Sequence, residues 1–406
     1  MARSLYICYF GVREPLVQTQ VLPYLRELAK AGHEMRIVTF EPDISGLESY
    51  GVTKLRDELA EQGIGWLYLK YHKRFSALAT AWDILAGAAF VRVAISRYQL
   101  EILHGRSHVA TLMGALGRRL AGRKPKLIFD IRGFFPEEYT DAGVWPENGV
   151  LFRTTKRIEK WLLRQADGFV VLTGKAKRIL FGDTPQRPVE VIPCCVDLRR
   201  FESANEEARA AMRAELGIGG RFVAAYVGAF GGWYLTQETA EFLGELKRKR
   251  PDTFAMILTQ SDPAMIEPML REAGFGSADV LISKVAAAEV PRYLSAADLA
   301  VSFIKNCYSK QASSPTKNAE YLACGLPIIA NSGIGDVDEL VDGDRVGVLI
   351  DRFDRPAYSA VVDAALAFDQ PSEHMREVAA REFDLVSVGG ARYRSLYERV
   401  MGGDAG

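Results

Sequence analysis

Cysteine is scarce in this 406-residue sequence, with five residues in all, an odd number. A disulfide framework is therefore not expected, and a reducing, cytoplasmic environment fits the composition. Two of the cysteines are adjacent, but no CxxC pair and no nearby histidine accompanies them, so they do not predict a metal or redox centre. The five are Cys8, Cys194, Cys195, Cys307 and Cys324.

Net charge is also absent, because 51 Lys and Arg balance 51 Asp and Glu. The balance hides an asymmetry: residues 1–200 carry 30 basic against 21 acidic side chains, and the remainder carries the reverse. One interpretation is compositional noise. The other is that the first half of the chain faces an anionic partner such as a membrane surface. We expect no nucleic-acid partner.

A clear membrane-spanning run is missing as well. The most apolar stretch covers residues 75–95, but Asp83 and Arg92 interrupt it, and a spanning helix needs about 20 clearly apolar residues. Because the basic triplet 72–74 precedes this stretch, one interpretation is an amphipathic helix lying on a bilayer. A buried or acceptor-lining helix is the favoured alternative. We therefore expect a cytoplasmic protein, peripheral to the inner face of the plasma membrane under the first interpretation.

Short apolar, β-branched runs alternate with segments of helical periodicity along the chain. Strands separated by helices indicate βαβ units and parallel sheets, so the predicted fold class is α/β. A polar stretch at 202–220 separates two such series and predicts two domains, 1–198 and 199–384. The expected strands are 5–9, 36–40, 64–69, 101–103, 127–129, 169–172 and 189–192 in the first, and 222–227, 254–258, 280–283, 300–303, 327–330 and 346–350 in the second.

Two doubly wound, Rossmann-like sheets would place their ligands at comparable positions. Ligands of such sheets lie beyond the carboxyl ends of the strands, where loops lead into helices. We therefore expect the two domains to face each other across a cleft. A deep cleft of this kind suits a reaction between two substrates from which water is kept out.

The most informative stretch covers residues 309–327. Ser313 or Ser314 is expected to cap a helix that has Pro315 in its first turn. The start of a helix offers unpaired N–H groups and the positive end of the dipole, which suits a diphosphate together with the charge of Lys317. Glu320 lies on the same face one turn later, where a carboxylate accepts both hydroxyls of a ribose. The alternative is a capped structural helix with an ordinary ion pair between the lysine and the glutamate.

This stretch resembles the second signature of the retaining GT-B glycosyltransferases of family 4. Glu320 and the segment 323–327, Ala-Cys-Gly-Leu-Pro, match its second half, whereas Ala312 stands where the family carries a first glutamate. The resemblance implies that a sugar is transferred with retention from a nucleotide diphosphate sugar, by family default a UDP-sugar. It implies a glycan or lipid-linked saccharide acceptor, as in polysaccharide and O-antigen assembly, and neither a metal nor a cofactor. The final helix, expected at 386–401 within 385–406, would return to pack on the first domain.

Further donor-binding residues follow from the same resemblance. The glycines after strand 222–227 allow a close approach of backbone to phosphate, but the Arg and Lys that usually follow this loop in the family are missing. Lys317, Lys310, Lys305 or Arg132 must then supply the cation, and Lys317 is favoured. The predicted donor site comprises Gly228, Ser313, Ser314, Thr316, Lys317, Glu320 and Lys310.

Polar residues near strand ends of the first domain are candidates for the acceptor side. The first strand–helix loop is similar to one that touches donor phosphates or acceptor in these transferases. Two later segments, 104–108 and 130–138, are expected to follow strands. Arg132, which suits a phosphate or carboxylate, joins Lys317 and Glu320 as predicted catalytic residues. The acceptor or cleft residues predicted are Gly11, Arg13, Gln18, His104, Arg106, Asp130 and Glu137.

Two other functions stay open at this stage. A sugar-nucleotide epimerase of the same shape would need carboxylates and histidines converging on the sugar. A non-catalytic nucleotide-sugar-binding protein is suggested by Ala312 and by the missing loop cations.

Overall fold

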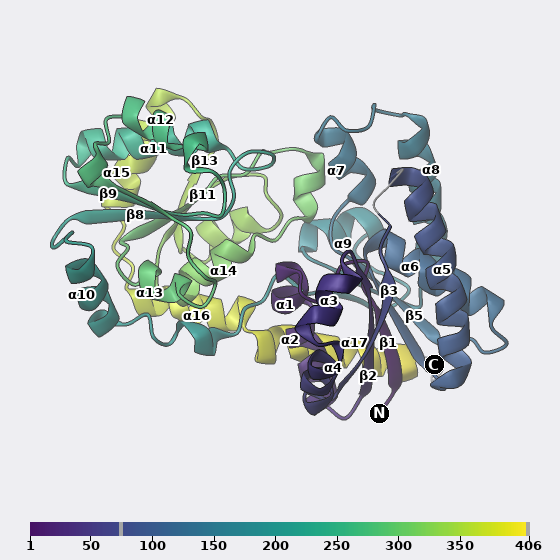
Figure 1. Ribbon diagram of the computed structural model, residues 1–406. Helices are drawn as coiled ribbons and strands as arrows, with labels where there is room; N and C mark the ends of the chain where they lie inside the picture. The colour runs from purple at the N-terminus through teal and green to yellow at the C-terminus, as the bar shows by residue number, and fades with distance from the viewer. Residues whose placement is uncertain (73–75, 403–406) are drawn as a thin grey trace. The chain divides into compact units, whose positions relative to one another are not determined.

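The computed structural model describes residues 1–72 and 76–402 (Figure 1). The chain divides into two compact units. One comprises Met1–Pro193 together with the C-terminal segment that starts at Leu385, and the other comprises Cys194–Asp384. The sequence places the first boundary a few residues later, after 198.

The first unit contains a seven-stranded parallel sheet in the order β3-β2-β1-β4-β5-β6-β7. All seven apolar runs expected in this half are strands. They are apolar because both faces of a parallel sheet are covered. The fourth was predicted too short: β4 continues through His104 to Arg106. The strands are β1 (Arg3–Ile7), β2 (Glu34–Glu41), β3 (Ile64–Lys70), β4 (Ile102–Arg106), β5 (Lys126–Ile131), β6 (Gly168–Val171) and β7 (Val189–Val191).

Helices cover this sheet. α6 packs on β1, β4 and β5, and both α5 and α8 pack against α6. At Gly87 and Gly117 the two helices α5 and α6 come so close that an added Cβ would lie within 3 Å of a side chain of the other helix. The helices are α1 (Pro15–Gln20), α2 (Leu22–Lys30), α3 (Ile44–Tyr50), α4 (Val52–Glu61), α5 (Ser76–Arg97), α6 (Ser107–Leu120), α7 (Phe135–Asp141), α8 (Val150–Gln165) and α9 (Gly174–Phe181).

The last helix belongs to the first unit. A π-helical turn, η6 (Leu385–Gly390), leads into α17 (Ala391–Gly402). One face of α17 is buried: Tyr393, Leu396, Tyr397 and Val400. α17 packs along α2 and β7.

Helix α5 is long and apolar enough to cross a membrane when judged by length and composition alone, and 39% of its most apolar window is buried. One face packs against α6, so the expectation of a buried helix is correct for that face. The opposite face leaves Leu78, Trp82, Leu85 and Val93 exposed. Lys73 and Arg74 of the basic triplet, and Phe75, lie outside the described residues.

The second unit contains a six-stranded parallel sheet in the order β10-β9-β8-β11-β12-β13. All six runs expected here are strands, and each agrees with its predicted ends to within one residue. They are β8 (Phe222–Val227), β9 (Thr253–Leu258), β10 (Val280–Ser283), β11 (Leu299–Ser302), β12 (Ile328–Asn331) and β13 (Gly347–Ile350).

Helices and single turns connect these strands. The α-helices are α10 (Glu206–Glu215), α11 (Thr236–Lys249), α12 (Glu267–Glu272), α13 (Val290–Leu294), α14 (Thr316–Ala323), α15 (Arg355–Leu366) and α16 (Ser372–Phe383). The turns are η1 (Leu198–Phe201), η2 (Pro263–Met265), η3 (Ser277–Asp279), η4 (Tyr308–Ala312) and η5 (Glu339–Gly343).

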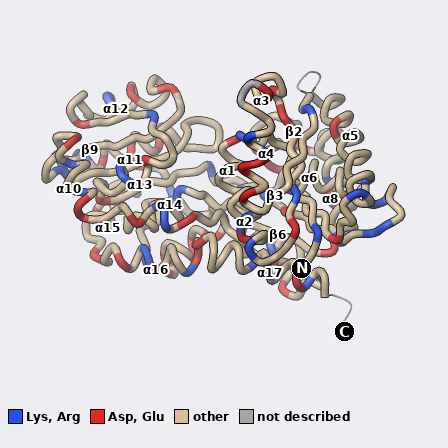
Figure 2. The backbone as a smooth tube through the Cα atoms, turned by 60° about the horizontal axis from the view of Figure 1, so that its bottom comes forward, with Lys and Arg blue, Asp and Glu red and all other residues tan. Residues whose placement is uncertain are grey.

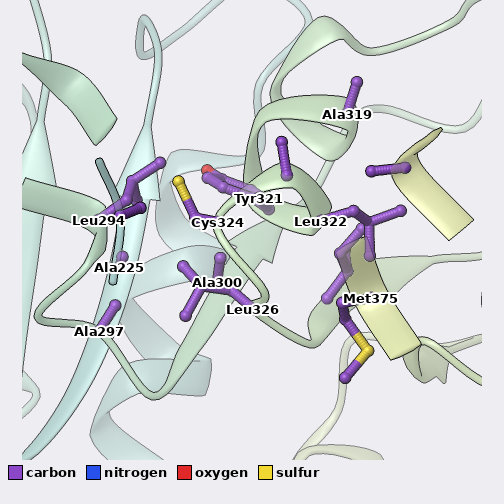
Figure 3. Close-up of a cluster of buried hydrophobic side chains, with 14 of the residues drawn as sticks. Ala225, Leu294, Ala297, Ala300, Ala319, Tyr321, Leu322, Cys324, Leu326 and Met375 are labelled. Atoms are coloured by element: carbon purple, nitrogen blue, oxygen red, sulfur yellow. The ribbon is translucent and has the colours of Figure 1, made fainter. Parts of the chain in front are cut away.

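Helix α14 is fixed to the sheet by its apolar side and by one hydroxyl. Figure 3 shows Tyr321, Leu322 and Cys324 directed into a buried cluster that also contains Leu294 and Ala300. The Tyr321 hydroxyl accepts a hydrogen bond from the Val227 amide at 2.8 Å and donates one to the Val301 carbonyl at 3.2 Å. It therefore joins β8 to β11. Because these bonds leave little freedom, the first turn of α14 has a defined position over the carboxyl ends of these two strands.

Each sheet has one topological switch point, where successive connections run in opposite directions. It lies between β1 and β4 in the first unit and between β8 and β11 in the second. Ligands of doubly wound sheets bind beside such points.

Candidate donor-binding site

The first turn of α14 lacks the cap that the sequence predicted. The helix begins at Thr316, its N-cap residue is the extended Pro315, and no side chain caps it. Ser314 lies one position and Ser313 two positions too early to do so. The Ser314 hydroxyl instead accepts a hydrogen bond from the Cys194 amide at 3.1 Å. The N–H groups that open a helix need partners, so this end of α14 is suited to a ligand.

Lys317 is the central cation of this site. Its side chain is 7% exposed, and among the described residues its Nζ has no hydrogen-bond partner. The ammonium lies 4.2 Å from the centre of the Tyr226 ring and 4.3 Å from that of Tyr234. Burial lowers the lysine pKa to about 7, although the Glu320 carboxylate acts in the opposite direction. Two aromatic faces thus hold the charge without neutralising it.

Gly228 brings the loop after β8 to the same place. Its φ of 139° lies in a region that side chains rarely adopt, and a Cβ added there would lie 2.9 Å from the Lys317 Nζ. A residue larger than glycine would displace the lysine. Gly228 and Lys317, two predicted donor-site residues far apart in sequence, therefore meet in space.

Glu320 lies one turn beyond Lys317 and is partly buried. Burial raises the pKa of its carboxyl group, opposed by the positive charges of Arg200 and Lys317. In the described part of the chain Lys317 and Glu320 do not form an ion pair. The structure therefore shows neither the side-chain cap nor the ion pair of the structural alternative.

Lys310 and the loops around it close one side of the site. The Lys310 Nζ lies 3.9 Å from the Trp233 ring centre, and the Lys310 carbonyl accepts from the Gly335 amide at 2.9 Å. The loops after β8, β11 and β12 thus converge. Ala312, at the position of the missing family glutamate, is buried.

Three residues of this region were missed from the sequence. Tyr226 and Tyr234 flank the glycine loop, and their aromatic character next to a predicted phosphate site was the available signal. Asn318 is 1% exposed, and neither its Oδ1 nor its Nδ2 has a partner among the described residues. Nothing in the sequence pattern distinguishes it from a solvent-facing asparagine.

The three residues predicted in the first strand–helix loop, Gly11, Arg13 and Gln18, have different surroundings. The Gln18 amide donates to the Val12 carbonyl at 2.7 Å, so it closes its own loop. Gly11 has Glu41 close by, since an added Cβ would lie 2.9 Å from the Glu41 Oε2. Arg13 is exposed.

His104, Arg106 and Asp130 lie at the carboxyl ends of strands, as expected, but inside β4 and β5 and not beyond them, and all three are buried. They form a polar cluster with tyrosines of β1 and α17: both Tyr6 and Tyr393 donate to the Asp130 Oδ2 at 3.2 Å. Burial lowers the His104 pKa to about 4, against the charge of Asp130. We call Tyr6, His104, Arg106, Asp130, Tyr393 and Tyr397 the tyrosine cluster.

Arg132 and Glu137 lie just beyond β5, as predicted. The Arg132 guanidinium is 3.6 Å from the Asp130 Oδ1, and the Glu137 carboxylate pairs with Lys156 at 2.8 Å. Both side chains are partly exposed.

Comparison with known proteins identifies this arrangement. Residues 17–200 match the model of Glycosyltransferase Family 4, and residues 208–382 match that of Glycosyl transferases group 1. With two parallel doubly wound sheets, these matches define the class as GT-B glycosyltransferases. The chain belongs to glycosyltransferase family 4 and is a glycosyltransferase.

Solved structures share the fold over nearly the whole chain. Sucrose-phosphate synthase from Thermosynechococcus elongatus is 17% identical with a TM-score of 0.71, and 99% of this chain and 100% of that chain are covered. Anabaena Alr3699/HepE in complex with UDP is 14% identical with a TM-score of 0.71 and coverages of 98% and 100%. WaaG, a glycosyltransferase of lipopolysaccharide biosynthesis, is 17% identical with a TM-score of 0.65 and the same coverages, 98% and 100%. No curated protein matches the chain by sequence.

Proposed function

We propose that this glycosyltransferase takes its sugar from a nucleotide diphosphate sugar, a UDP-sugar in the first instance. The diphosphate binds at the start of α14 and the ribose binds to Glu320. The observation that carries the proposal is the Lys317 ammonium, which is buried beside Gly228 and has no hydrogen-bond partner among the described residues.

The energetics favour an anionic ligand here. A charged group removed from water without a partner is costly, which is why the Lys317 pKa is low. A diphosphate would supply the negative charge that stabilises Lys317. Its oxygens would accept hydrogen bonds from the N–H groups at the start of α14. Anabaena HepE, whose fold is similar, has been solved with UDP and with UDP-glucose, which supports this class of donor.

The same charges would serve the transfer step. As the bond between the anomeric carbon and the diphosphate breaks, negative charge collects on the leaving group, and a fixed cation and a helix N-terminus stabilise it. In this proposal the helix and Lys317 supply the positive charge that a divalent metal supplies elsewhere. The family resemblance implies retention, with the acceptor hydroxyl attacking on the face from which the diphosphate leaves.

Calorimetric titration of the full chain with UDP and with uridine tests the site. Lys317→Ala should weaken UDP binding about tenfold or more and uridine binding much less, because uridine lacks the diphosphate. Lys305→Ala removes an exposed lysine of the neighbouring loop and should change UDP affinity less than twofold. Equal losses for UDP and uridine, or a larger loss in Lys305→Ala, would reject the assignment.

The acceptor is proposed to be a glycan or lipid-linked saccharide. With labelled UDP-sugar and a lipid-linked acceptor pool, transfer places the label in the lipid fraction. A changed free sugar nucleotide with no labelled lipid would instead indicate the epimerase.

Peripheral membrane contact through the first unit is part of this proposal, at the inner face of the plasma membrane. The exposed apolar face of α5 supports it, because Trp82 and its neighbours lie at helical spacing on one side. Figure 2 shows basic residues along α8, which packs with α5 on α6. Such a combination favours anionic lipid surfaces.

Cosedimentation with phosphatidylglycerol vesicles tests the membrane contact. Binding is expected at low salt, and Trp82→Ser with Leu85→Ser should reduce it at least fivefold. Replacing the exposed Met265 of the second unit by Ser is the matched control. Absence of vesicle binding at low salt would remove this part of the proposal without touching the donor site.

A further inference from the structure

A buried carboxylate interrupts the packed face of α5. Asp83 is the only acidic residue of this 22-residue helix and is fully buried. Its neighbours on the packed face, Ala79, Gly87 and Val91, are small or apolar. A buried carboxylate is costly unless several donors reach it. The residues that donate hydrogen bonds to Asp83 therefore indicate its role.

Asp83 receives three hydrogen bonds from two residues of the carboxyl edge of the sheet. The Tyr9 hydroxyl donates to its Oδ2 at 2.7 Å, and the His72 amide donates to the same oxygen at 3.1 Å. The His72 Nδ1 lies 2.6 Å from Oδ1. Tyr9 is itself held by edge contacts with Phe40 and Tyr71, with ring centres 4.9 and 5.2 Å apart.

This geometry fixes the His72 imidazole. A carboxylate only accepts hydrogen bonds, so the proton of the neutral ring is on Nδ1, and Nε2 keeps its lone pair. The His72 side chain is 39% exposed. Within residues 1–72 and 76–402, no group bonds to Nε2. The partly exposed His72 ring, two residues beyond the end of β3, therefore carries an oriented acceptor atom.

We propose that His72 binds a hydroxyl group of the acceptor saccharide through Nε2, with Asp83 and Tyr9 as positioning residues. The inference rests on the proposed function, because it assumes that the acceptor is a saccharide. The carboxyl edge of a doubly wound sheet is where ligands bind. A hydroxyl is the matching partner, since it donates to the lone pair that Asp83 keeps available. The tyrosine cluster in β4 and β5 offers no comparable partly exposed imidazole, because its histidine is buried.

The first test is the state of the ring itself. Histidine-selective ¹⁵N NMR of the full chain should show His72 in the Nδ1–H form, and Asp83→Asn should abolish that preference. Octyl β-D-glucoside, galactoside and mannoside are then titrated into the wild type. A shift of the Nε2 resonance with at least one glycoside is expected, and no shift with any of the three overturns the proposal.

The second test separates acceptor from donor. With the glycoside that shifts Nε2 as acceptor, His72→Gln should raise the acceptor KM at least tenfold, and Asp83→Asn should raise it severalfold. UDP-sugar affinity should stay within twofold in both. His374→Gln, which alters a partly buried histidine of the second unit bonded to the Asp344 carbonyl, is the matched control.

The outcomes distinguish the two proposals. An unchanged acceptor KM in His72→Gln, with donor binding intact, overturns the acceptor assignment and leaves the donor site standing. Failure of the wild type to bind any nucleotide sugar contradicts the proposed function instead, while the NMR titration still decides whether His72 binds a saccharide.

Discussion

Buried polar groups near the central strands of the two sheets differ in their hydrogen bonding. In the second unit Lys317 is buried between aromatic rings, and its Nζ has no hydrogen-bond partner among the described residues. In the first unit the buried Asp130 and His104 are hydrogen-bonded to tyrosines of β1 and α17. Only the His104 Nε2 and the Asp130 Oδ1 of these two side chains lack a hydrogen-bond partner among the described residues. A buried cation whose neighbours are aromatic rings therefore favours a ligand site, whereas a buried carboxylate that accepts hydrogen bonds from two tyrosines favours a structural role.

The largest expected effect tests the structural role of the tyrosine cluster. Asp130→Ala removes the acceptor of two tyrosine hydroxyls and leaves Arg106 buried without its carboxylate, 3.7 Å away. The free energy of unfolding should fall by about 3–5 kcal/mol, as measured by urea denaturation. Asp57→Ala, in an exposed position of α4, should have little effect. Loss of activity at unchanged stability would show that the cluster binds a ligand instead.

The second prediction concerns the proposed donor site of the second unit and uses Glu320→Ala. If the carboxylate holds the ribose, transition-state stabilisation falls by about 2–4 kcal/mol. That is roughly a 30- to 800-fold loss in kcat/KM at unchanged fold, judged by circular dichroism. Glu373→Ala, on the exposed side of α16, serves as control. An unaltered kcat/KM in Glu320→Ala removes the ribose assignment.

The pH dependence of UDP binding tests the role of the Lys317 charge. With its pKa lowered to about 7, Lys317 of the free protein is largely protonated below pH 7 and neutral above it. A bound diphosphate favours the protonated form, so above pH 7 binding must take up a proton. Affinity should then fall about tenfold per pH unit between pH 7.5 and 9. Calorimetry in buffers of different ionisation enthalpy measures the uptake. A flat profile, or the same slope in Lys317→Ala, would contradict the assignment.

The smallest effect concerns the loop glycine. Gly228→Ala puts a Cβ against the Lys317 ammonium and strains the backbone, which costs on the order of 1–3 kcal/mol. UDP affinity should fall about five- to tenfold. Gly232→Ala is a matched control, since Gly232 also has a positive φ, 60°, but open space around it. Equal affinity losses in both variants would mean that strain alone, and not displacement of Lys317, is responsible.

Most of the fold could be predicted, and the site only in part. The thirteen strands follow from short buried runs, because strands covered on both faces leave an unmistakable apolar signature. Gly228 directly follows β8 and Lys317 lies in the first turn of the α-helix that follows β11, so the two residues meet because β8 and β11 are neighbouring parallel strands. The cap at Ser313 or Ser314 was wrong because Pro315 occupies the N-cap position itself. His104 was misplaced because a polar residue inside a buried strand imitates the end of that strand.

The sequence by itself determined the two parallel sheets and membership in the glycosyltransferases, because periodicity and local motifs are encoded in neighbouring residues. It also predicted an anion site at the start of α14. Only the tertiary structure decided which polar groups are satisfied. Whether Lys317 lacks a partner, whether Asp83 holds His72 and whether Tyr393 reaches Asp130 depends on contacts across up to 263 positions of the chain. Hydrogen bonding and desolvation act over a few ångströms of space, and separation along the chain does not set that distance.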